Sequence, residues 1–354
     1  MNHMNHIAGK LKDYGLDAML ITSAPGEFYA VGFHGEGVAL VTTKGNYYYT
    51  DSRYIEAAQR QITDCEVSLP PAGLGYPKTI QSLVEKLSLS KVGFEGQYMS
   101  VDTYERWKSV LSAELIPAGK LIEELRVVKD AEEIELMEAA QRITDEAFTK
   151  ICAFIQPGMS EIEIAARLQY EMLVAGAQRM SFDPIVASGP NGSMPHAIPG
   201  ARKVQKGDFI TMDFGCVVGG YCSDMTRTVA LGGPTEEMKT VYATVLEAQK
   251  AGIAVAKGGV TGDVVHGAAA DVIAAAGYGE YFGHGFGHSV GIEIHEDPRF
   301  SPAWKKPIPA GAVLSAEPGI YLPGKFGVRI EDVLVLEENG NRDITHSPKE
   351  LIIL

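Results

Sequence analysis

The chain has 354 residues, and its 31 Lys and Arg stand against 45 Asp and Glu, which gives a formal charge of −14. The length is typical of about two domains, and 45 % hydrophobic with 21 % charged residues is the composition of a folded globular protein. The acidic balance argues against nucleic acid or an anionic membrane as a partner, and no apolar run reaches the roughly 18 residues of a membrane span.

The N-terminal segment predicts a cytoplasmic location. Residues 1–16 carry Lys10, Lys12 and Asp13 where a signal peptide would have its apolar stretch. The four cysteines of the chain are scattered and too few for a disulfide framework, which also favours a reducing compartment.

The first third of the chain alternates short apolar strands with helical segments. The strands are predicted from β-branched and aromatic residues bounded by Gly, Pro and Asp, at 18–22, 37–42 and 46–50. Helices are predicted over 54–62, 76–87 and 101–111. This alternation predicts an α/β domain.

A charged stretch at 123–133 opens a long amphipathic helix, and we place the domain boundary at its start. The N-terminal domain then covers residues 1–122, and a second domain covers residues 123–354.

The second domain shows two similar halves. A helix over 131–155 is followed by a second helix, which begins at the capping box Ser160-x-x-Glu163, and then by strands. After Thr235 the same order returns, with one helix over 236–257 and another that follows the predicted cap Thr261 and stops near Gly277. The repeat predicts a pseudo-symmetric α+β domain.

The segment 209–228 is typical of a β-hairpin. Its residues alternate on both sides of Gly219-Gly220, which suits a two-residue turn. Such a turn pairs Val218 with Tyr221 and fixes the register of the whole hairpin.

In that register Asp213 and Asp224 lie on one face of the hairpin. Thr226 is opposite Asp213, so Asp224 is its diagonal neighbour, with the two Cβ atoms roughly 7 Å apart or less. Two carboxylates on an apolar face with no cation built in beside them would repel each other. We therefore expect them to share a bound cation.

Further acidic and imidazole side chains occur where other apolar strands end. Glu317 follows a strand and precedes Pro318, and Glu331 alternates with core-facing residues. A glycine-rich segment contains His288 and His295, which face opposite ways on an ideal strand, so their convergence requires a bend. Four carboxylates and one imidazole form a hard-ligand set that suits Mn²⁺ or Co²⁺, with Zn²⁺ or Fe²⁺ also possible, and four negative charges balance two divalent ions.

At these residues the chain resembles the pita-bread metallopeptidases, which include methionine aminopeptidase, aminopeptidase P and prolidase. The resemblance implies a metal site made of Asp213, Asp224, His288, Glu317 and Glu331. It implies two divalent ions, Mn²⁺ most favoured and Co²⁺ or Zn²⁺ possible, that activate a water molecule and are bridged by Asp224 and Glu331.

Four further motifs resemble the proline-specific branch of that family: 50–54, 93–96, 125–133 and 181–189. The resemblance implies a creatinase-type α/β N-terminal domain with a mixed sheet, followed by a pita-bread catalytic domain, in a homodimer. The catalytic residues that it implies are His196, His284, His295, Glu317 and Arg329.

The implied reaction is hydrolysis of the Xaa-Pro bond in small peptides with proline at the second position. Arg299 could bind the free carboxylate of a dipeptide, which favours an Xaa-Pro dipeptidase (prolidase), and Tyr321 could shape the pocket. The alternative is an Xaa-Pro aminopeptidase (aminopeptidase P) that acts on longer peptides, and the sequence leaves this length specificity open.

Two other classes remain as alternatives. Gly287-His-Ser289-Val-Gly291 matches the nucleophile elbow of α/β-hydrolases, and Asp332 and His346 follow in the order of such a serine hydrolase. An inactive peptide-binding homologue would show damaged ligands, and none of the five is damaged.

Overall fold

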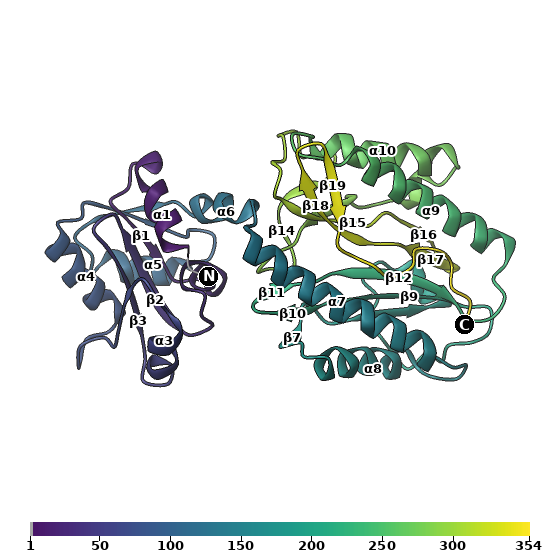
Figure 1. The fold of residues 1–354 in the computed structure, drawn as a ribbon, viewed down its shortest axis with the longest axis horizontal. Helices are drawn as coiled ribbons and strands as arrows, with labels where there is room; N and C mark the ends of the chain where they lie inside the picture. The colour runs from purple at the N-terminus through teal and green to yellow at the C-terminus, as the bar shows by residue number, and fades with distance from the viewer. Residues whose placement is uncertain (1–2) are drawn as a thin grey trace. The chain divides into compact units, whose positions relative to one another are not determined.

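The computed structural model describes residues 3–354 of the chain. The chain divides into two compact units, Met1–Arg126 and Val127–Leu354 (Figure 1). Among the described residues, no helix combines the length and the apolar character that crossing a membrane requires.

The first unit contains a mixed sheet with the strand order β4-β3-β2-β1-β5-β6. Its strands are β1 (Ala18–Ile21), β2 (Gly37–Thr42), β3 (Gly45–Thr50), β4 (Glu66–Ser68), β5 (Lys91–Phe94) and β6 (Glu114–Pro117). The strands β1, β2 and β3 pair antiparallel, whereas β4, β5 and β6 join in parallel pairs. The predicted α/β domain with a mixed sheet is confirmed.

The helices of this unit are α1 (Met4–Lys10), the 3₁₀ helix η1 (Leu11–Tyr14), α2 (Ala24–Val31), α3 (Ile55–Gln61), α4 (Tyr76–Leu87), α5 (Val101–Lys108) and α6 (Lys120–Val127). Ile80 of α4 and Trp107 of α5 share one buried cluster with Leu40 and Val92 of the sheet. The amphipathic pattern that predicted α4 and α5 therefore marks the faces that cover the sheet.

The second unit, all of which the structure describes, repeats one arrangement twice. The first half comprises α7 (Ala131–Phe154), α8 (Glu161–Val174), β7 (Arg179–Met180), β8 (Ile185–Ser188), the 3₁₀ helix η2 (Gly189–Ser193), β9 (Phe209–Phe214), β10 (Cys216–Val218), β11 (Tyr221–Cys222) and β12 (Met225–Ala230). The second half comprises α9 (Glu236–Val255), α10 (Gly262–Ala275), the 3₁₀ helix η3 (Gly279–Tyr281), β13 (Gly287–Ser289), β14 (Glu296–Phe300), β15 (Val313–Ala316), β16 (Gly319–Leu322), β17 (Phe326–Arg329), β18 (Asp332–Glu337) and β19 (Gly340–Asp343).

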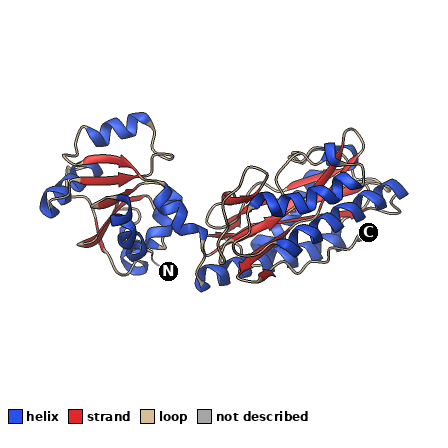
Figure 2. Ribbon diagram, turned by 90° about the horizontal axis from the view of Figure 1, so that it is seen from above, coloured by secondary structure: helices blue, strands red, loops and turns tan. Residues whose placement is uncertain are grey.

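Each half has its own sheets, with the strand orders β12-β9-β8 and β11-β10-β7 in the first half and β14-β13-β15-β18-β19 and β16-β17 in the second. The helices of this unit lie along its strands (Figure 2). The predicted pseudo-symmetric α+β architecture is confirmed.

Local capping sets where these helices begin. Ser160 and Glu163 form the predicted capping box of α8, each side chain accepting from the other's backbone N–H. Thr261 precedes α10 as predicted but does not cap it, because its hydroxyl donates to Asp263 Oδ1 instead.

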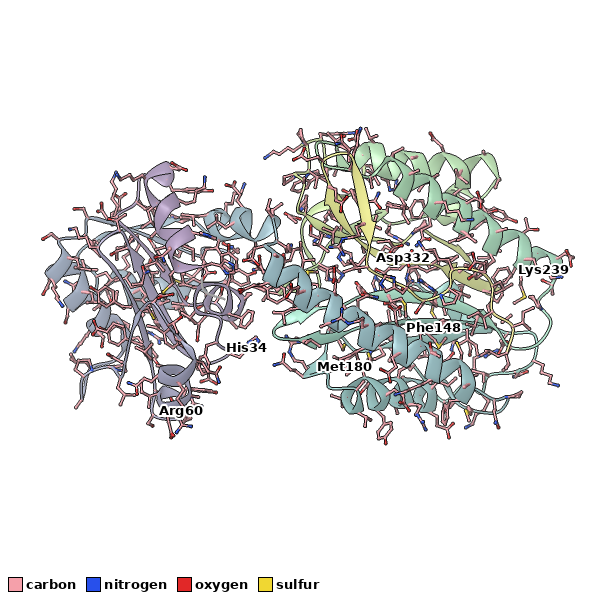
Figure 3. The ribbon with its side chains drawn as sticks, viewed as in Figure 1. His34, Arg60, Phe148, Met180, Lys239 and Asp332 are labelled. Atoms are coloured by element: carbon pink, nitrogen blue, oxygen red, sulfur yellow. The ribbon has the colours of Figure 1, made fainter. Side chains whose placement is uncertain are left out.

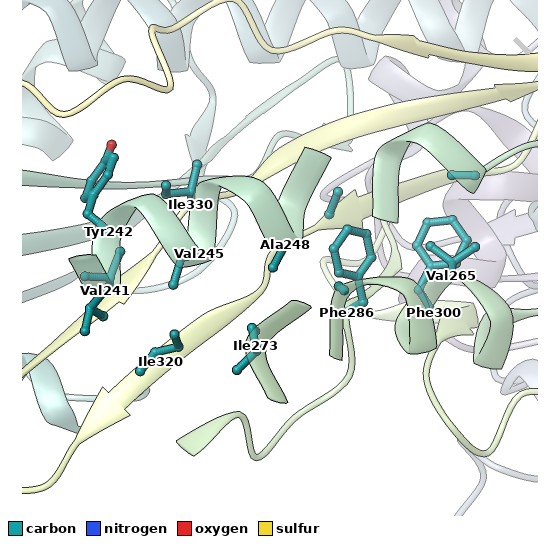
Figure 4. Close-up of a cluster of buried hydrophobic side chains, with 14 of the residues drawn as sticks. Val241, Tyr242, Val245, Ala248, Val265, Ile273, Phe286, Phe300, Ile320 and Ile330 are labelled. Carbon is teal, nitrogen blue, oxygen red and sulfur yellow. The ribbon is translucent and has the colours of Figure 1, made fainter. Parts of the chain in front are cut away.

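Each half also buries its own hydrophobic cluster. In the second half, Val245 of α9 and Ile273 of α10 pack with Phe286 and Ile330 (Figure 4). In the first half, Phe148 of α7, labelled in Figure 3, belongs to the cluster that covers β9 and β12. In each half, helices and strands therefore share one buried core.

Candidate metal centre and active site

The predicted hairpin register is confirmed. Val218 pairs with Tyr221 across a turn formed by Gly219 and Gly220, whose φ angles of 56° and 87° suit glycine. The same register continues into β9 and β12, where Thr226 is opposite Asp213.

One cavity of about 1120 Å³ in the second unit gathers the predicted metal site. It is lined, among other residues, by Asp213, Asp224, His288, Glu317 and Glu331. One ligand atom each from Asp224, His288 and Glu331 lie within 4.8 Å of one another. His288 Nε2 lies 3.6 Å from Asp224 Oδ2 and 3.3 Å from Glu317 Oε1.

A cation does lie beside one of the two hairpin aspartates, contrary to the expectation from the sequence. The guanidinium of Arg329 is buried, and its NH2 nitrogen is 2.7 Å from Asp213 Oδ2. Arg329 reaches Asp213 because β17 packs next to β9, a contact between segments that local patterns do not show.

Burial raises the pKa values of the three remaining carboxyl groups. Burial, followed by the charges of Glu331 and Asp213, raises the pKa of Asp224 well above its usual value. Burial likewise raises the pKa of Glu331 well above its usual value, with Glu317 and Asp213 adding to the effect. Burial raises the pKa of Glu317 to about 7, although nearby Arg329 opposes the shift.

Two buried oxygens fit a metal ion. Asp213 Oδ1 and Glu331 Oε1 have no hydrogen-bond partner among the described residues. The other oxygen of each carboxylate is occupied, by Arg329 and by the Thr226 hydroxyl at 2.6 Å respectively. A cation would satisfy the orphaned oxygens and the excess negative charge together, so the residues present fit divalent metal ions.

A hydrogen bond also orients the imidazole of His288 as a candidate metal ligand. The Nδ1 atom of His288 lies 3.1 Å from the backbone oxygen of Ser289, to which it donates as an N–H. Its Nε2 lone pair then faces Asp224 and Glu317, as in many metal-binding histidines. Burial lowers the pKa of His288 to about 3, which keeps the ring neutral.

Several residues that sequence reasoning missed support the ligands from behind. Gln141 of α7 accepts from the backbone N–H of Asp224 at 3.4 Å, and the Thr226 carbonyl accepts from the N–H of Glu331 at 3.0 Å. The Ser315 hydroxyl accepts from the N–H of His288 and donates to Glu317. Except for the contact between Ser315 and Glu317, which are two residues apart, these contacts join distant segments, so no local signal in the sequence marks them.

His288 and His295 converge, which an ideal strand would not allow. Their ring centroids are 4.4 Å apart in an edge-to-face arrangement. The pairing of β13 with β14 shifts register between His288 and Ser289, and the chain reverses direction between the two strands. This irregularity supplies the bend that convergence requires.

The other predicted catalytic side chains line the same cavity: His196, His284, His295 and Arg329, together with Tyr321 and Arg299. Arg329 NH1 donates to the Tyr321 hydroxyl at 2.9 Å, and that hydroxyl lies 2.9 Å from His284 Nε2. Burial lowers the pKa of His284 to about 4, so its ring is neutral near pH 7. Arg299 is exposed and contacts Asp297 at 3.2 Å.

The serine-hydrolase alternative is contradicted by the geometry. Ser289 is fully buried in β13 and no helix follows it. Asp332, labelled in Figure 3, is paired with Arg227 and Lys349, and His346 is exposed. A nucleophile elbow needs an accessible serine at a strand-to-helix turn, and this serine has neither property.

The chain matches known protein families over nearly its whole length. Residues 135–338 match the model of metallopeptidase family M24, and residues 4–128 match the creatinase/prolidase N-terminal domain. An uncharacterized peptidase of Bacillus subtilis, YqhT, is 43 % identical over 100 % of this chain and 99 % of its own.

Solved structures are also similar. The Xaa-Pro dipeptidase from Bacillus anthracis has a TM-score of 0.96 and 41 % identity, with 99 % of each chain covered. The X-Pro aminopeptidase from Thermotoga maritima has a TM-score of 0.94 and 36 % identity, with 100 % of each chain covered.

Proposed function

This chain belongs to metallopeptidase family M24, and we propose that it is an Xaa-Pro dipeptidase that hydrolyses small peptides with proline at the second position. One observation carries the proposal: a single cavity is lined by all five candidate metal ligands and by the three histidines His196, His284 and His295. The similar chain from Bacillus anthracis, described as an Xaa-Pro dipeptidase, supports the choice of substrate.

We expect two divalent ions in this cavity, with Mn²⁺ favoured and Co²⁺ or Zn²⁺ possible. The ligands would be Asp213, Asp224, His288, Glu317 and Glu331, whose four carboxylates can balance two dipositive charges. Bound divalent cations supply Lewis acidity and lower the pKa of a coordinated water.

The residues of the chain would then handle the proton and the substrate. The nitrogen of an Xaa-Pro bond carries no hydrogen, so it must receive a proton when it leaves. We assign this transfer to a carboxylate oxygen of Glu317, which lies in the cavity beside His288. To His295, which is exposed and lines the cavity, we assign hydrogen-bond donation to the carbonyl oxygen of the scissile bond.

Two further side chains suit recognition of a short substrate. Arg299 lines the cavity with its guanidinium half exposed, and it can pair with the free carboxylate of a dipeptide. Tyr321 holds Arg329 and His284 by hydrogen bonds, which fixes the wall of the pocket.

An Xaa-Pro aminopeptidase is the second candidate, because the similar chain from Thermotoga maritima is described as an X-Pro aminopeptidase. Hydrolysis of Ala-Pro and Ala-Pro-Ala separates the two. Chelated protein should regain activity with Mn²⁺, Co²⁺ or Zn²⁺. Cleavage of the dipeptide alone supports a dipeptidase, cleavage of the tripeptide supports an aminopeptidase, and cleavage of neither contradicts the proposal.

We also propose a cytoplasmic homodimer. All four cysteines, each within the described residues, are free thiols, which suits a reducing compartment. Light scattering after gel filtration would measure the number of subunits, and a monomer would contradict the proposed dimer.

A further inference from the structure

One wall of the cavity is a loop that runs over residues 189–200. Its members Pro195, His196, Ile198 and Pro199 line the cavity. His196 is exposed, and the Ile198 side chain is 88 % exposed. The centre of the loop has few anchors, namely the buried Ala197 and a 3.4 Å hydrogen bond from Arg329 NH1 to the Pro195 carbonyl, so the position of the loop also depends on how its ends are held.

A single buried carboxylate holds both ends. Glu161, the first residue of α8, is fully buried. Its Oε1 accepts from the backbone N–H of Ser188 at 2.8 Å and from the Ser188 hydroxyl at 2.7 Å, just before the loop. Its Oε2 accepts from the backbone N–H of Gly200 at 3.2 Å, at the end of the loop.

A third contact lies inside the loop. The Nδ2 atom of Asn191 is 3.0 Å from Glu161 Oε1 and 3.1 Å from Oε2. The carboxylate therefore takes hydrogen bonds from three separate points of the segment. We call this set of Glu161, Ser188, Asn191 and Gly200 the loop clamp.

The base of the clamp is rigid. The capping box of Ser160 and Glu163 fixes the first turn of α8, and the backbone N–H of Glu161 donates to the Arg202 carbonyl at 3.1 Å. On the opposite side the loop rests directly on β17, where a Cβ added to Gly327 would lie 2.0 Å from the carbonyl oxygen of Gly192. The loop is thus fixed between α8 and β17.

A carboxylate buried in this way depends on its donors. Taking it out of water is unfavourable unless hydrogen bonds replace the lost hydration. The donors depend equally on the carboxylate, because buried N–H groups left without an acceptor are destabilising. The carboxylate and its donors therefore hold the ends of the loop together, and losing either should loosen the path of the loop.

We propose that Glu161 is a positioning residue that places His196 in the active site by closing the loop over 189–200. The inference rests on the proposed function in one respect, that His196 contacts the substrate. Glu161 itself lies outside the residues that line the cavity, so its effect on hydrolysis must pass through the loop.

The test compares Glu161→Gln with Glu163→Gln in the full-length, Mn²⁺-supplemented protein. Glu163 is a matched control, because it is in the same helical turn but is exposed and contacts Ser160 and Lys203 rather than the loop. A Gln at this position keeps a side-chain oxygen that can accept from the Ser160 N–H, so the capping box of α8 is retained. Glu161→Gln should lower kcat/KM for Ala-Pro about 10- to 100-fold, as a displaced contact residue would. Glu163→Gln should stay within about twofold of the parent.

Two readouts separate positioning from general stability. Amide hydrogen exchange over residues 189–200 should speed up in Glu161→Gln and not in Glu163→Gln. In a His196→Ala background, adding Glu161→Gln should lower kcat/KM by less than about threefold, because the residue to be positioned is already gone. An undiminished loss in that background, or unchanged exchange of the loop, would overturn the proposal.

Failure here is distinguishable from failure of the proposed function. A parent protein that does not hydrolyse Ala-Pro would refute the function, whereas the exchange measurement tests the clamp without any substrate. If Glu161→Gln does not fold, Asn191→Ala removes one donor from the same clamp, and faster exchange confined to the loop is expected again. Unchanged exchange in Asn191→Ala would then overturn the proposal.

Discussion

At the scale of single residues, the cavity is a cluster of acids held close together by the fold. Asp224 and Glu331 are buried, which raises the pKa of both; the charge of Glu331 adds to the shift of Asp224, and the charges of Glu317 and Asp213 add to that of Glu331. Arg329 compensates Asp213, but no second arginine or lysine lines this cavity apart from the exposed Arg299. A cluster of carboxylates like this favours cation binding, because a bound cation neutralises the repulsion between them.

Replacing a central acid should abolish hydrolysis without unfolding the protein. Asp224→Asn or Glu331→Gln is expected to lower kcat/KM for Ala-Pro by more than about 100-fold, since even residues behind metal ligands matter by 10- to 100-fold. Asp271→Asn, which changes an exposed acid of α10, should leave the rate unchanged. Near-normal rates with both ligand variants, at unchanged circular dichroism, would refute the assignment of these ligands.

Because the pKa of Glu317 is raised in the folded protein, the difference in unfolding free energy between the parent and a Glu317→Gln variant should depend on pH. The pKa of Glu317 is about 7 when folded, against 4.5 as its ordinary value. The native state therefore prefers the protonated acid, and that contribution to stability is lost as pH rises from about 4.5 through about 7. Without metal, the unfolding free energy of Glu317→Gln should rise relative to that of the parent as pH increases through this range. Above about pH 7 the difference between the two should stay constant. Urea unfolding in EDTA at several pH values measures this, and a difference that shrinks as pH rises would contradict it.

At the scale of elements, the hairpin around Gly219-Gly220 sets the relative position of two candidate metal ligands, Asp213 and Asp224. Its register follows from the turn and the alternation of the strands, so a one-residue slip would send Asp213 to the opposite face. This is why the register could be predicted before the structure: both signals are local. The capping box of α8 was predictable for the same reason.

Other parts of the site were not predictable. The convergence of His288 with His295 depends on a shift in strand pairing within a glycine-rich segment that has no periodic pattern. The pairing of Arg329 with Asp213 and the loop clamp of Glu161 join residues far apart in sequence. Tertiary packing alone decides such contacts.

The turn of the hairpin can be tested through Gly220, whose φ is 87°. Gly220→Ala should lower the free energy of unfolding by about 1–2 kcal/mol, because an L side chain disfavours the left-handed region. Gly220→Asn should cost less, since asparagine tolerates that region. Urea denaturation compares them, and equal stability of the parent and the Ala variant would show that the turn is not strained.

At the scale of the whole molecule, the candidate catalytic side chains all belong to one compact unit. Every ligand and every histidine of the cavity lies within Val127–Leu354. Among residues 3–354, those that line this cavity all belong to the second unit, while the first unit has a sheet and core of its own. We therefore expect metal binding to need the second unit alone.

A fragment that begins at Val127 should fold and bind Mn²⁺ about as tightly as the full chain does. Two buried clusters of its own support folding, and the full set of candidate ligands supports binding. Titration calorimetry on the fragment and the full chain measures both affinities. Affinity lost from a folded fragment would show that the first unit takes part in the metal site.

The spread of the ligands along the chain has a consequence for how the protein is made. Asp213 and Asp224 leave the ribosome together on one hairpin, but Glu317 and Glu331 are added only after α9, α10 and several further strands. A nascent chain would thus display an incomplete acidic pair with little selectivity for any ion. Binding of metal by the complete set of candidate ligands would then have to wait until the strands that follow α10 have been synthesised and have docked.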